Sequence, residues 1–192
     1  MCRPGDTSSW TKVQEHMPPC CYDYSDCCLG KDTVFYKGNF YYIGDCCTIY
    51  RIRFEFGLHH HSPSSTEALP VQKHQFQQYS NTMTNYLLEL NGDLLLVSRY
   101  VIWVSGTCAF EVYKLDWNMQ EWAEVTNIGN HAILLGKRTS KSLVAAGGNY
   151  FKANCIYFAD DSCLTQTSNV VPPYDTGVYE AVPFCLLVKS SE

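Results

Sequence analysis

The segment 86–125 reads YLLELNGDLLLVSRYVIWVSGTCAFEVYKLDWNMQEWAEV, and its pattern decides the fold. It holds four runs rich in apolar residues, divided by short turn signals, at 86–90, 94–104, 110–116 and 121–125. The first turn contains Asn91 and Gly92, residues that tolerate the backbone conformations of a tight turn. Four short strands joined in this way predict an antiparallel meander, which is the content of one β-propeller blade. The run at 94–104 is apolar almost throughout, so we expect it to be buried on both faces.

The same plan recurs along the chain. Turn signals at Gly38, Gly92 and Asn154 each lead into a short apolar strand, and they lie 54 and 62 residues apart. Trp10 and Trp122 precede two of these turns by 28 and 32 residues, which predicts a shared packing role between blades. Repeats near 50 residues with several short strands are typical of propeller blades. We therefore predict an all-β fold, a partial propeller of about three to four blades, each an antiparallel four-stranded meander.

Two further features concern the fold class and the domain organisation. No long stretch has apolar residues at helical spacing, which disfavours an α/β fold because parallel crossovers need helices. The length suits one domain, so we expect residues 1–192 to form a single partial propeller. Residues 57–81 break the repeat with a polar stretch, and we predict that they form an insertion, either a long surface loop or a disordered segment.

Charge and hydropathy limit the classes of partner. The chain has 14 Lys and Arg against 19 Asp and Glu, a formal net charge of −5, whereas nucleic-acid binders usually present a basic face. The short basic cluster of Lys137, Arg138 and Lys141 is interpreted as a solvated loop, so no nucleic-acid partner is expected. Apolar runs are far shorter than a membrane span, and the N-terminus lacks the apolar core of a signal peptide. We expect no membrane association and a cytoplasmic or nuclear location.

The 11 cysteines are an odd number in a chain without a secretion signal, which favours free thiols over a disulfide framework. Cys108 and Cys155 lie among apolar residues and are expected to fill the core. The sharpest zinc candidate combines three Cys-Cys pairs, at Cys20 and Cys21, Cys27 and Cys28, and Cys46 and Cys47. Adjacent cysteines are not the usual two-residue-spaced zinc knuckle, and the adjacent imidazoles of His59, His60 and His61 splay apart. We therefore predict no metal site.

The sequence gives only weak support for any catalytic residue. His131 follows a turn signal and is interpreted as a turn or core histidine, and the adjacent Asp160 and Asp161 as a solvated turn. The tryptophans at positions 10, 103, 117 and 122 favour packing over a sugar-binding platform. The sequence has neither a Gly-x-Ser-x-Gly elbow nor a Walker-type phosphate loop. We predict no catalytic residue, no cofactor and no enzyme activity. A propeller glycosidase or lactonase is the disfavoured alternative.

An ordered series of motifs resembles one plant family. The series is Gly92-Asp-Leu-Leu-Leu-Val-Ser-Arg, Phe110-Glu-Val-Tyr-Lys-Leu-Asp, Trp122-Ala-Glu-Val, Asn130-His-Ala-Ile-Leu-Leu-Gly and Asn154-Cys-Ile-Tyr-Phe-Ala-Asp-Asp-Ser. Earlier and later segments fit the same series, at Trp10-Thr-Lys-Val, Val34-Phe-Tyr-Lys-Gly-Asn-Phe-Tyr and Tyr174-Asp-Thr-Gly-Val-Tyr. Together they resemble the kelch-like β-propeller domain of plant F-box proteins of the KIB type.

The resemblance implies a protein-binding module that recruits a ubiquitination target to an SCF-type ubiquitin ligase. In that family an F-box segment binds a Skp1-like adaptor, and the propeller binds the target. No F-box region precedes Cys2, so we expect adaptor binding only if an F-box is present elsewhere. The 57–81 segment and the ending at 183–189 also depart from the family pattern. A truncated paralogue without a ligase role is the alternative, because an open propeller leaves unpaired strand edges.

Overall fold

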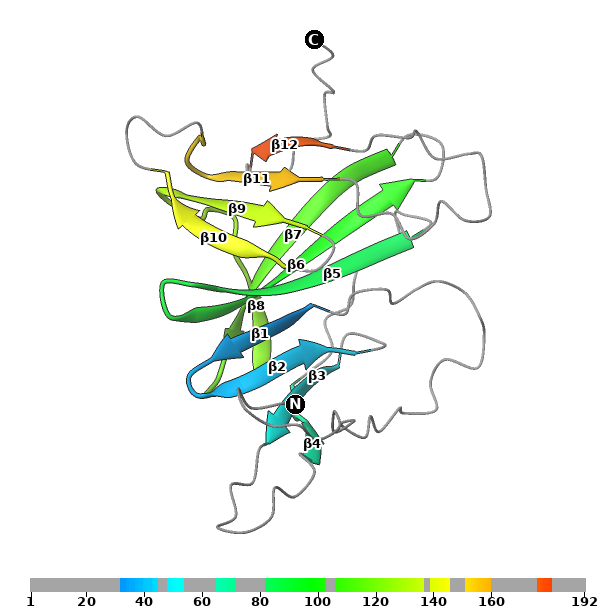
Figure 1. Cartoon of the computed structure of the whole chain (residues 1–192), viewed down its shortest axis with the longest axis vertical. Coiled ribbons are helices and arrows are strands. Elements are labelled where there is room, and N and C mark those ends of the chain that lie inside the picture. Colours follow the sequence, from blue (N-terminus) through cyan, green and yellow to red (C-terminus); the bar gives the residue numbers. More distant parts are fainter. Residues whose placement is uncertain are drawn as a thin grey trace, which may run out of the picture.

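The computed structural model describes residues 32–44, 48–53, 65–71, 82–102, 106–136, 139–145, 151–159 and 176–180. Within this part, the chain forms twelve strands in three four-stranded sheets and contains no helix (Figure 1). Accordingly, no described helix is long and apolar enough to span a membrane. The predicted all-β class is confirmed, and the three sheets are consistent with a partial propeller.

The first sheet is an antiparallel meander of β1 (Thr33–Tyr36), β2 (Asn39–Ile43), β3 (Ile49–Arg53) and β4 (Ser65–Ala68). β4 lies inside the 57–81 segment, which was predicted to be a loop or a disordered segment, so residues 65–68 of that segment form a strand instead. This strand is short and polar and lies at the sheet edge, where no apolar alternation marks it in the sequence. The rest of that segment, apart from 69–71, lies outside the described residues.

The second sheet is the meander predicted from the opening segment. Its strands are β5 (Thr82–Leu90), β6 (Asp93–Ile102), β7 (Gly106–Asp116) and β8 (Glu121–Glu124), paired antiparallel in this order. Every β6 residue from 94 to 101 is buried, which confirms that this strand is covered on both faces. A bulge between Tyr100 and Val101 shifts its register against β7.

Equivalent tight turns join the first two strands of the first and second sheets. Lys37 and Gly38 have φ of 44° and 82°, and Asn91 and Gly92 have φ of 53° and 80°. Positive φ at both central residues is the pattern of a type I′ hairpin turn, whose twist matches that of the flanking strands. Both glycines therefore stand where their backbone freedom is needed, as the turn signals predicted.

The third sheet has a different topology from a simple meander. Its strands are β9 (His131–Leu135), β10 (Lys141–Val144), β11 (Cys155–Phe158) and β12 (Gly177–Glu180), in the order β10-β9-β11-β12. β11 runs parallel to β9, whereas the other two pairs are antiparallel. β10 pairs with one edge of β9 and is held against β5, because Ser142 Oγ donates a 2.7 Å hydrogen bond to the Glu89 carbonyl. The opposite edge of β9 is then available to β11.

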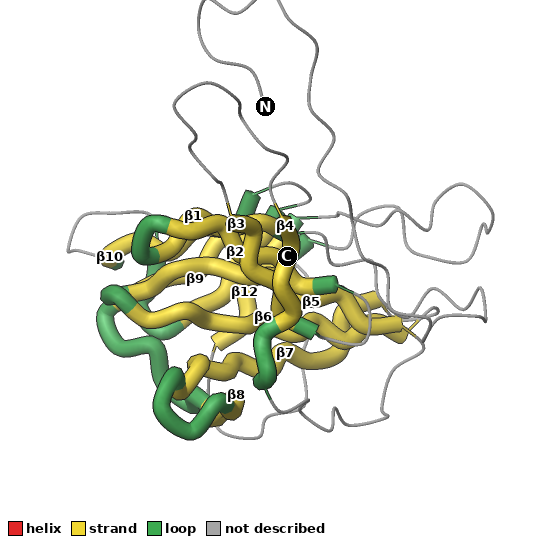
Figure 2. The backbone as a smooth tube through the Cα atoms, turned by 90° about the horizontal axis from the view of Figure 1, so that it is seen from below, coloured by secondary structure: helices red, strands yellow, loops and turns green. Residues whose placement is uncertain are grey.

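The three sheets stack side by side, with their first edge strands adjacent. β5 contacts both β1 and β10, and Figure 1 shows it between them. One apolar cluster, which includes Tyr36, Ile43 and Trp122, lies between the first and second sheets. Another, which includes Ile133 and Ile156, lies between the second and third sheets. Figure 2 shows the same stack from below, built in its described part from strands and loops.

Arg99 links the second sheet to the third. Its side chain is only 2 % exposed and lies on β6. The guanidinium donates hydrogen bonds to Thr107 Oγ1 at 2.7 Å and, more weakly, to Tyr86 Oη and the Ala159 carbonyl at 3.3 Å. Its central carbon also lies 4.8 Å from the ring centroid of Phe158, a cation–π contact. A planar fork with five donors suits this dispersed set of acceptors better than an ammonium group would.

A polar pair lies where the three sheets meet. Asp32, just before β1, and Ser140, just before β10, are close together, and the backbone of Leu87 on β5 also contacts the Asp32 carboxyl group. Burial raises the pKa of Asp32, against smaller opposing effects from the Ser140 hydroxyl and the backbone amides of Thr33 and Leu87. Neither Asp32 Oδ2 nor Ser140 Oγ has a good hydrogen bond to a described group. The ionised carboxylate is therefore poorly solvated in the folded state.

We predict that Arg99→Lys lowers the free energy of unfolding by about 3 kcal/mol, because a buried ammonium replaces the fork and cannot reach all of its acceptors. Arg99→Met should cost less, since it leaves no buried charge. Arg53→Met is the control on an exposed arginine and should change stability by less than about 0.5 kcal/mol. Urea denaturation of the purified variants measures all three, and wild-type stability for Arg99→Lys would contradict the structural role of Arg99.

Asp32→Asn should raise the free energy of unfolding by about 1 kcal/mol at pH 7, because it removes a poorly solvated buried charge. A carboxyl whose folded-state pKa is raised favours folding at low pH and disfavours it above that pKa. The gain should therefore shrink as the pH falls and vanish below about pH 3, where Asp32 is protonated in both states.

Asp116→Asn is the control, and its effect on the free energy of unfolding at neutral pH should have the opposite sign. Hydrogen bonds from the Met119 and Asn118 amides lower the pKa of Asp116, so its charge favours folding at neutral pH. This variant should lose stability at pH 7, and the loss should shrink as the pH falls. Thermal unfolding between pH 3 and pH 8 measures both trends, and parallel pH profiles for the two variants would refute the assignment.

Candidate interaction surface

One end of the stack gathers three tight turns from two sheets. We call this the turn surface: Lys37 and Gly38 of the β1–β2 turn, Asn91 and Gly92 of the β5–β6 turn, and residues 117–120 of the β7–β8 turn. The Tyr36 hydroxyl donates a 2.8 Å hydrogen bond to the Gly92 carbonyl, which fixes the first two turns relative to each other. Rigid strands thus hold short loops in a defined arrangement, the usual setting of a binding surface.

Trp117 is the aromatic anchor of the turn surface. Its ring stacks on Tyr36 with centroids 5.8 Å apart and planes 5° apart, and it meets Tyr41 edge-on at 5.7 Å. These contacts join the β7–β8 turn of the second sheet to the first sheet. Trp117 nevertheless remains 39 % exposed. Trp117 therefore packs as predicted on one side of its ring, but the rest of the ring is in contact with solvent and could also contact a partner.

The β7–β8 turn is held by a carboxylate cap. Asp116 Oδ1 accepts hydrogen bonds from the amides of Asn118 at 2.8 Å and Met119 at 3.0 Å. The capped turn carries Met119 outward, with 65 % of its side chain exposed. Methionine is flexible and polarisable, so it adapts to irregular apolar surfaces. A rigid tryptophan beside an adaptable methionine is a combination common at protein interfaces.

Charged groups border the turn surface. Lys37 Nζ lies 4.9 Å from the Tyr36 ring centroid, and Lys114 Nζ lies 3.4 Å from Asp93 Oδ2. Lys37 is charged at neutral pH, as an exposed lysine is, and contact with the Tyr36 hydroxyl raises its pKa further. The apolar centre therefore has a mixed-charge rim, which is the usual anatomy of a protein–protein interface.

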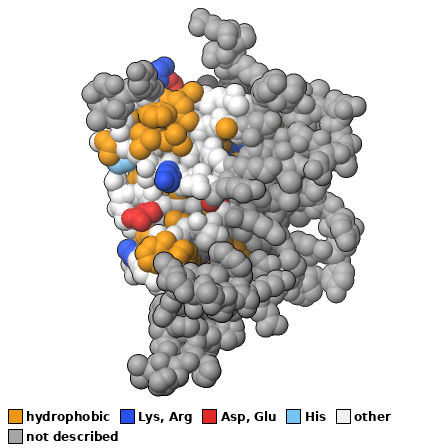
Figure 3. All heavy atoms as spheres, viewed as in Figure 1, with side chains coloured by type: hydrophobic (Ala, Val, Ile, Leu, Met, Phe, Trp, Pro, Cys, Tyr) orange, Lys and Arg blue, Asp and Glu red, His pale blue; other side chains and the backbone are white. Residues whose placement is uncertain are grey.

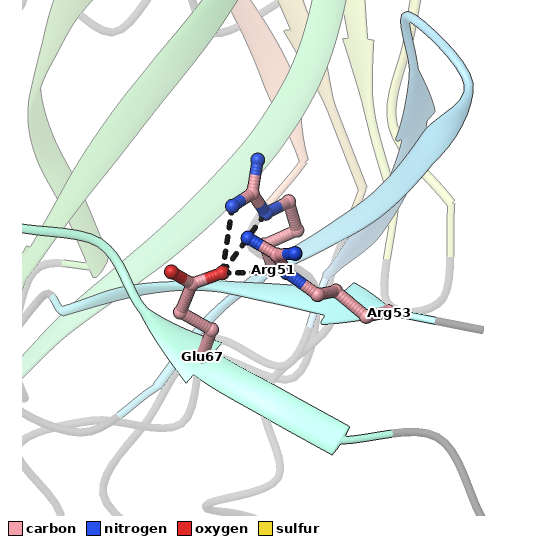
Figure 4. Close-up of polar contacts among 3 residues, drawn as sticks. All are labelled: Arg51, Arg53 and Glu67. Atoms are coloured by element: carbon pink, nitrogen blue, oxygen red, sulfur yellow. Dashed lines mark hydrogen bonds and ion pairs between the residues drawn. The ribbon is translucent and has the colours of Figure 1, made fainter. Parts of the chain in front are cut away.

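An ion triad lies on the outer strands of the first sheet (Figure 4). Glu67 Oε2 on β4 accepts hydrogen bonds from Arg51 Nη2 at 2.6 Å and Arg53 Nε at 2.8 Å, both on β3. Arg51 first, and then Arg53, lower the pKa of Glu67. The triad carries a net charge of +1 and ties the short β4 to β3. Because the groups are substantially exposed, their contribution to stability is small.

Several residues singled out from the sequence have definite places. Trp122 is buried in the cluster between the first and second sheets, as its predicted inter-blade role requires. His131 is buried at the start of β9, consistent with a core histidine. Cys155 is a buried free thiol whose pKa is raised by burial, and Cys108 is half-buried, with its thiol 3.3 Å from the Tyr100 carbonyl. Lys141 is exposed on β10.

Other candidates lie outside the described residues. They are Trp10, the pairs Cys20–Cys21, Cys27–Cys28 and Cys46–Cys47, the triple His59–His61, Trp103, Lys137, Arg138, Asp160 and Asp161. Among the side chains that the structure does describe, no three from His, Cys, Asp and Glu come together as metal ligands.

The turn surface was not predicted from the sequence, although the sequence contains a signal for it. The turn Asp116-Trp-Asn-Met-Gln places two large apolar side chains at its tip, where polar residues are usual. An aspartate that can cap a turn, followed within the turn by large apolar residues, predicts an exposed apolar site. What the sequence could not show is the Tyr36 ring beneath Trp117, because that contact joins separate sheets.

Comparisons with known proteins agree with this architecture and with the earlier resemblance. The family described as the KIB1-4 beta-propeller matches residues 1–180. The chain is 25% identical to F-box protein At2g26160 over 83% of its own length and 46% of the relative's. It is 28% identical to F-box protein At4g35733 over 70% of its length and 38% of that protein. It is 24% identical to F-box protein KIB4 over 83% of its length and 34% of that protein.

All three relatives are from Arabidopsis thaliana, and the chain spans less than half the length of each. No solved structure matches the chain significantly. The family match covers the three described sheets and the turns that join them. The chain therefore belongs to the KIB1-4 β-propeller family.

Proposed function

We propose that the chain is a protein-binding propeller that recruits a ubiquitination target to an SCF-type ubiquitin ligase in the cytoplasm or nucleus. Two observations support the proposal. The relatives are named as F-box proteins, which places the family in the context of adaptor-mediated recruitment. The turn surface offers an exposed tryptophan and an exposed methionine on a rigid base.

The placement of Trp117 carries the argument. An exposed aromatic ring already fixed by stacking loses little conformational entropy when a partner covers it. Tryptophan is also the residue type most enriched among the few side chains that dominate binding energy. With Met119 beside it and Lys37 at the rim, the surface suits a protein partner that presents an apolar group flanked by polar ones.

Within this proposal, the parts of the ligase have separate tasks. An F-box segment, where present in the longer protein, binds the Skp1-like adaptor, and the propeller binds the target. The chain therefore acts by binding rather than by catalysis. The proposed partner is a protein, and the turn surface is the proposed contact site.

Capture from plant cells, followed by binding measurements with the purified captured partner, tests the proposal. We expect Met119→Lys and Trp117→Ala each to weaken that binding at least tenfold, the scale of a dominant interface residue. Met119 contributes little to packing, so its variant should keep the wild-type melting temperature.

The matched control is Val144→Lys, which places the same charge at an exposed apolar residue on β10, outside the turn surface. It should bind as the wild type does. Equal binding by wild type, Met119→Lys and Trp117→Ala would remove the turn surface from the proposal. A captured partner whose ubiquitination is unchanged when the full-length F-box protein is removed would remove the ligase role.

A further inference from the structure

The ion triad on the first sheet carries more positive charge than its own carboxylate neutralises. Arg51 and Arg53 both donate to one atom, Glu67 Oε2, and no other carboxylate among the described residues bonds to either arginine. These groups are substantially exposed, so the triad adds little to stability. The surplus charge is therefore better explained by binding than by folding.

Arg53 is the member of the triad with unused donors. Its Nε donates a 2.8 Å hydrogen bond to Glu67, and 54 % of its side chain is exposed. Within the part of the chain that the structure describes, its two terminal nitrogens have no acceptor. A guanidinium presents five N–H groups, and its pair of terminal nitrogens makes a second fork that matches the two oxygens of a carboxylate. This fork can therefore bind an oxyanion from a partner without breaking the bond to Glu67.

The rest of the triad holds the Arg53 fork in place. Arg51 bonds to Glu67 Oε2 through Nη2 at 2.6 Å and through Nε at 3.3 Å, and it also contacts the Tyr41 hydroxyl. Glu67 is thereby bonded to both arginines, and Figure 4 shows both guanidinium groups beside its carboxylate. A cation that is ordered before binding loses less conformational entropy when a partner arrives.

The triad continues the turn surface along the first sheet. Trp117 meets Tyr41 edge-on, with ring centroids 5.7 Å apart, and Tyr41 pairs directly with Arg51 across β2 and β3. Residues that pair directly share a face of the sheet, and so do residues two positions apart on a strand, so Arg53 lies on this face as well. β3 runs toward the β1–β2 turn, which places Arg53 at the same end of the sheet as Trp117. An unbroken row of side chains therefore leads from the indole ring to the Arg53 fork.

The other end of this row is apolar. Trp117 is 39 % exposed and Met119 is 65 % exposed. In Figure 3, charged side chains of both signs lie beside the hydrophobic ones over the first sheet. An apolar centre with charged groups at its border is the usual composition of a protein–protein interface. A partner segment that follows the row therefore meets an apolar site and then a cationic one.

Charge complementarity shows which anion fits the cationic site. The triad has a net charge of +1, from two arginines and one glutamate, and a single carboxylate neutralises it. A phosphate group carries a charge of about −2 near neutral pH. It would leave an excess of negative charge beside Glu67, and the two anions would repel each other. An aspartate or glutamate side chain is therefore favoured over a phosphorylated residue.

We propose that the turn surface and the triad together bind a target segment in which an aspartate or glutamate lies near a large apolar residue. The apolar side chain packs on Trp117 and Met119, and the carboxylate accepts two hydrogen bonds from the Arg53 fork. This inference rests on the proposed function, because it takes the turn surface as the contact site for the target. It adds the chemical class of the segment that is recognised.

Selection from a phage-displayed library of random peptides tests the proposal without a ligase or a known target. The wild-type chain should enrich peptides that combine aspartate or glutamate with a large apolar residue. Arg53→Met should lose the preference for acidic residues and keep the preference for apolar ones, whereas Trp117→Ala should lose the apolar preference. Arg53→Met is expected to be as stable as the wild type, so its loss of acidic peptides reports on binding. Val144→Lys is the control outside the row, and it should select the same peptides as the wild type.

Synthetic copies of a selected peptide measure the Arg53 contact. Replacing the acidic residue with its amide should weaken binding to the wild type about tenfold, the scale of a hydrogen bond to a charged group. The same replacement should have no effect on binding to Arg53→Met, because the partner of the carboxylate is already absent. A copy with phosphoserine in place of the acidic residue should bind no more tightly than the original peptide. Fluorescence anisotropy with labelled peptides gives each dissociation constant.

Three results would overturn the inference. The first is a wild-type selection without enrichment of acidic residues. The second is an amide replacement that weakens binding to the wild type and to Arg53→Met equally. The third is a phosphoserine copy that binds about tenfold more tightly than the carboxylate peptide, or tighter still, which would assign the cationic site to phosphate.

Failure of this inference is distinguishable from failure of the proposed function. A target captured from plant cells that depends on Trp117 and Met119 but binds equally well to Arg53→Met would keep the proposed function and remove the acidic contact. Acidic peptides selected as expected, with no target whose ubiquitination depends on the full-length F-box protein, would keep the acidic contact and remove the ligase role.

Discussion

The structure depends on the burial of β6 on both faces. A strand at the centre of an antiparallel sheet can leave one face in water, but β6 is buried at every residue from 94 to 101. Its alternate side chains therefore need an apolar layer on each side. The first sheet supplies one layer through Tyr36 and Ile43, and the third supplies the other through Ile133 and Ile156. Side-by-side stacking follows from this requirement.

Double burial also determines where polar groups can be placed on this strand. Ser98 and Arg99 interrupt the apolar run, and both are fully enclosed. Ser98 faces the first sheet and donates a 2.8 Å hydrogen bond to Asn85, whereas Arg99 faces the third sheet and bonds to Thr107. Apolar contacts alone tolerate small shifts between sheets. A buried polar group that must meet its acceptor makes one arrangement preferable. Arg99 therefore helps to fix the third sheet through the Ala159 carbonyl and the Phe158 ring, whereas the Ser98–Asn85 bond helps to fix the pairing of β6 with β5.

The sequence predicted what depends on local pattern. The type I′ turns at Gly38 and Gly92, the meander of the second sheet and the doubly buried β6 all follow from turn residues and apolar runs. Prediction from the sequence failed for elements whose structure depends on contacts with residues that are distant in the chain. β4 depends on its backbone pairing with β3, and the parallel pairing of β9 and β11 is set by the position of β10 against β5. The exposed anchor at Trp117 likewise depends on Tyr36, far away in the sequence.

The same requirement that orders the middle of the stack bears on its two ends. A repeat that gives each sheet two apolar faces solves the burial problem for every interior sheet but recreates it at the first and last. Phe40 and Tyr42 repeat the positions of Leu94 and Leu96, so the first sheet has the composition of an interior sheet rather than of a polar cap. Repeat proteins that end freely in water carry polar capping faces, whereas the residues on the side of the first sheet turned away from the second sheet include none that is charged. Tyr50 on this outer side of the first sheet is only 5 % exposed, and Ala132 and Cys155 on the outer side of the third sheet are 0 % and 1 % exposed, so the outer sides of the end sheets are themselves buried at their centres, as their apolar composition requires.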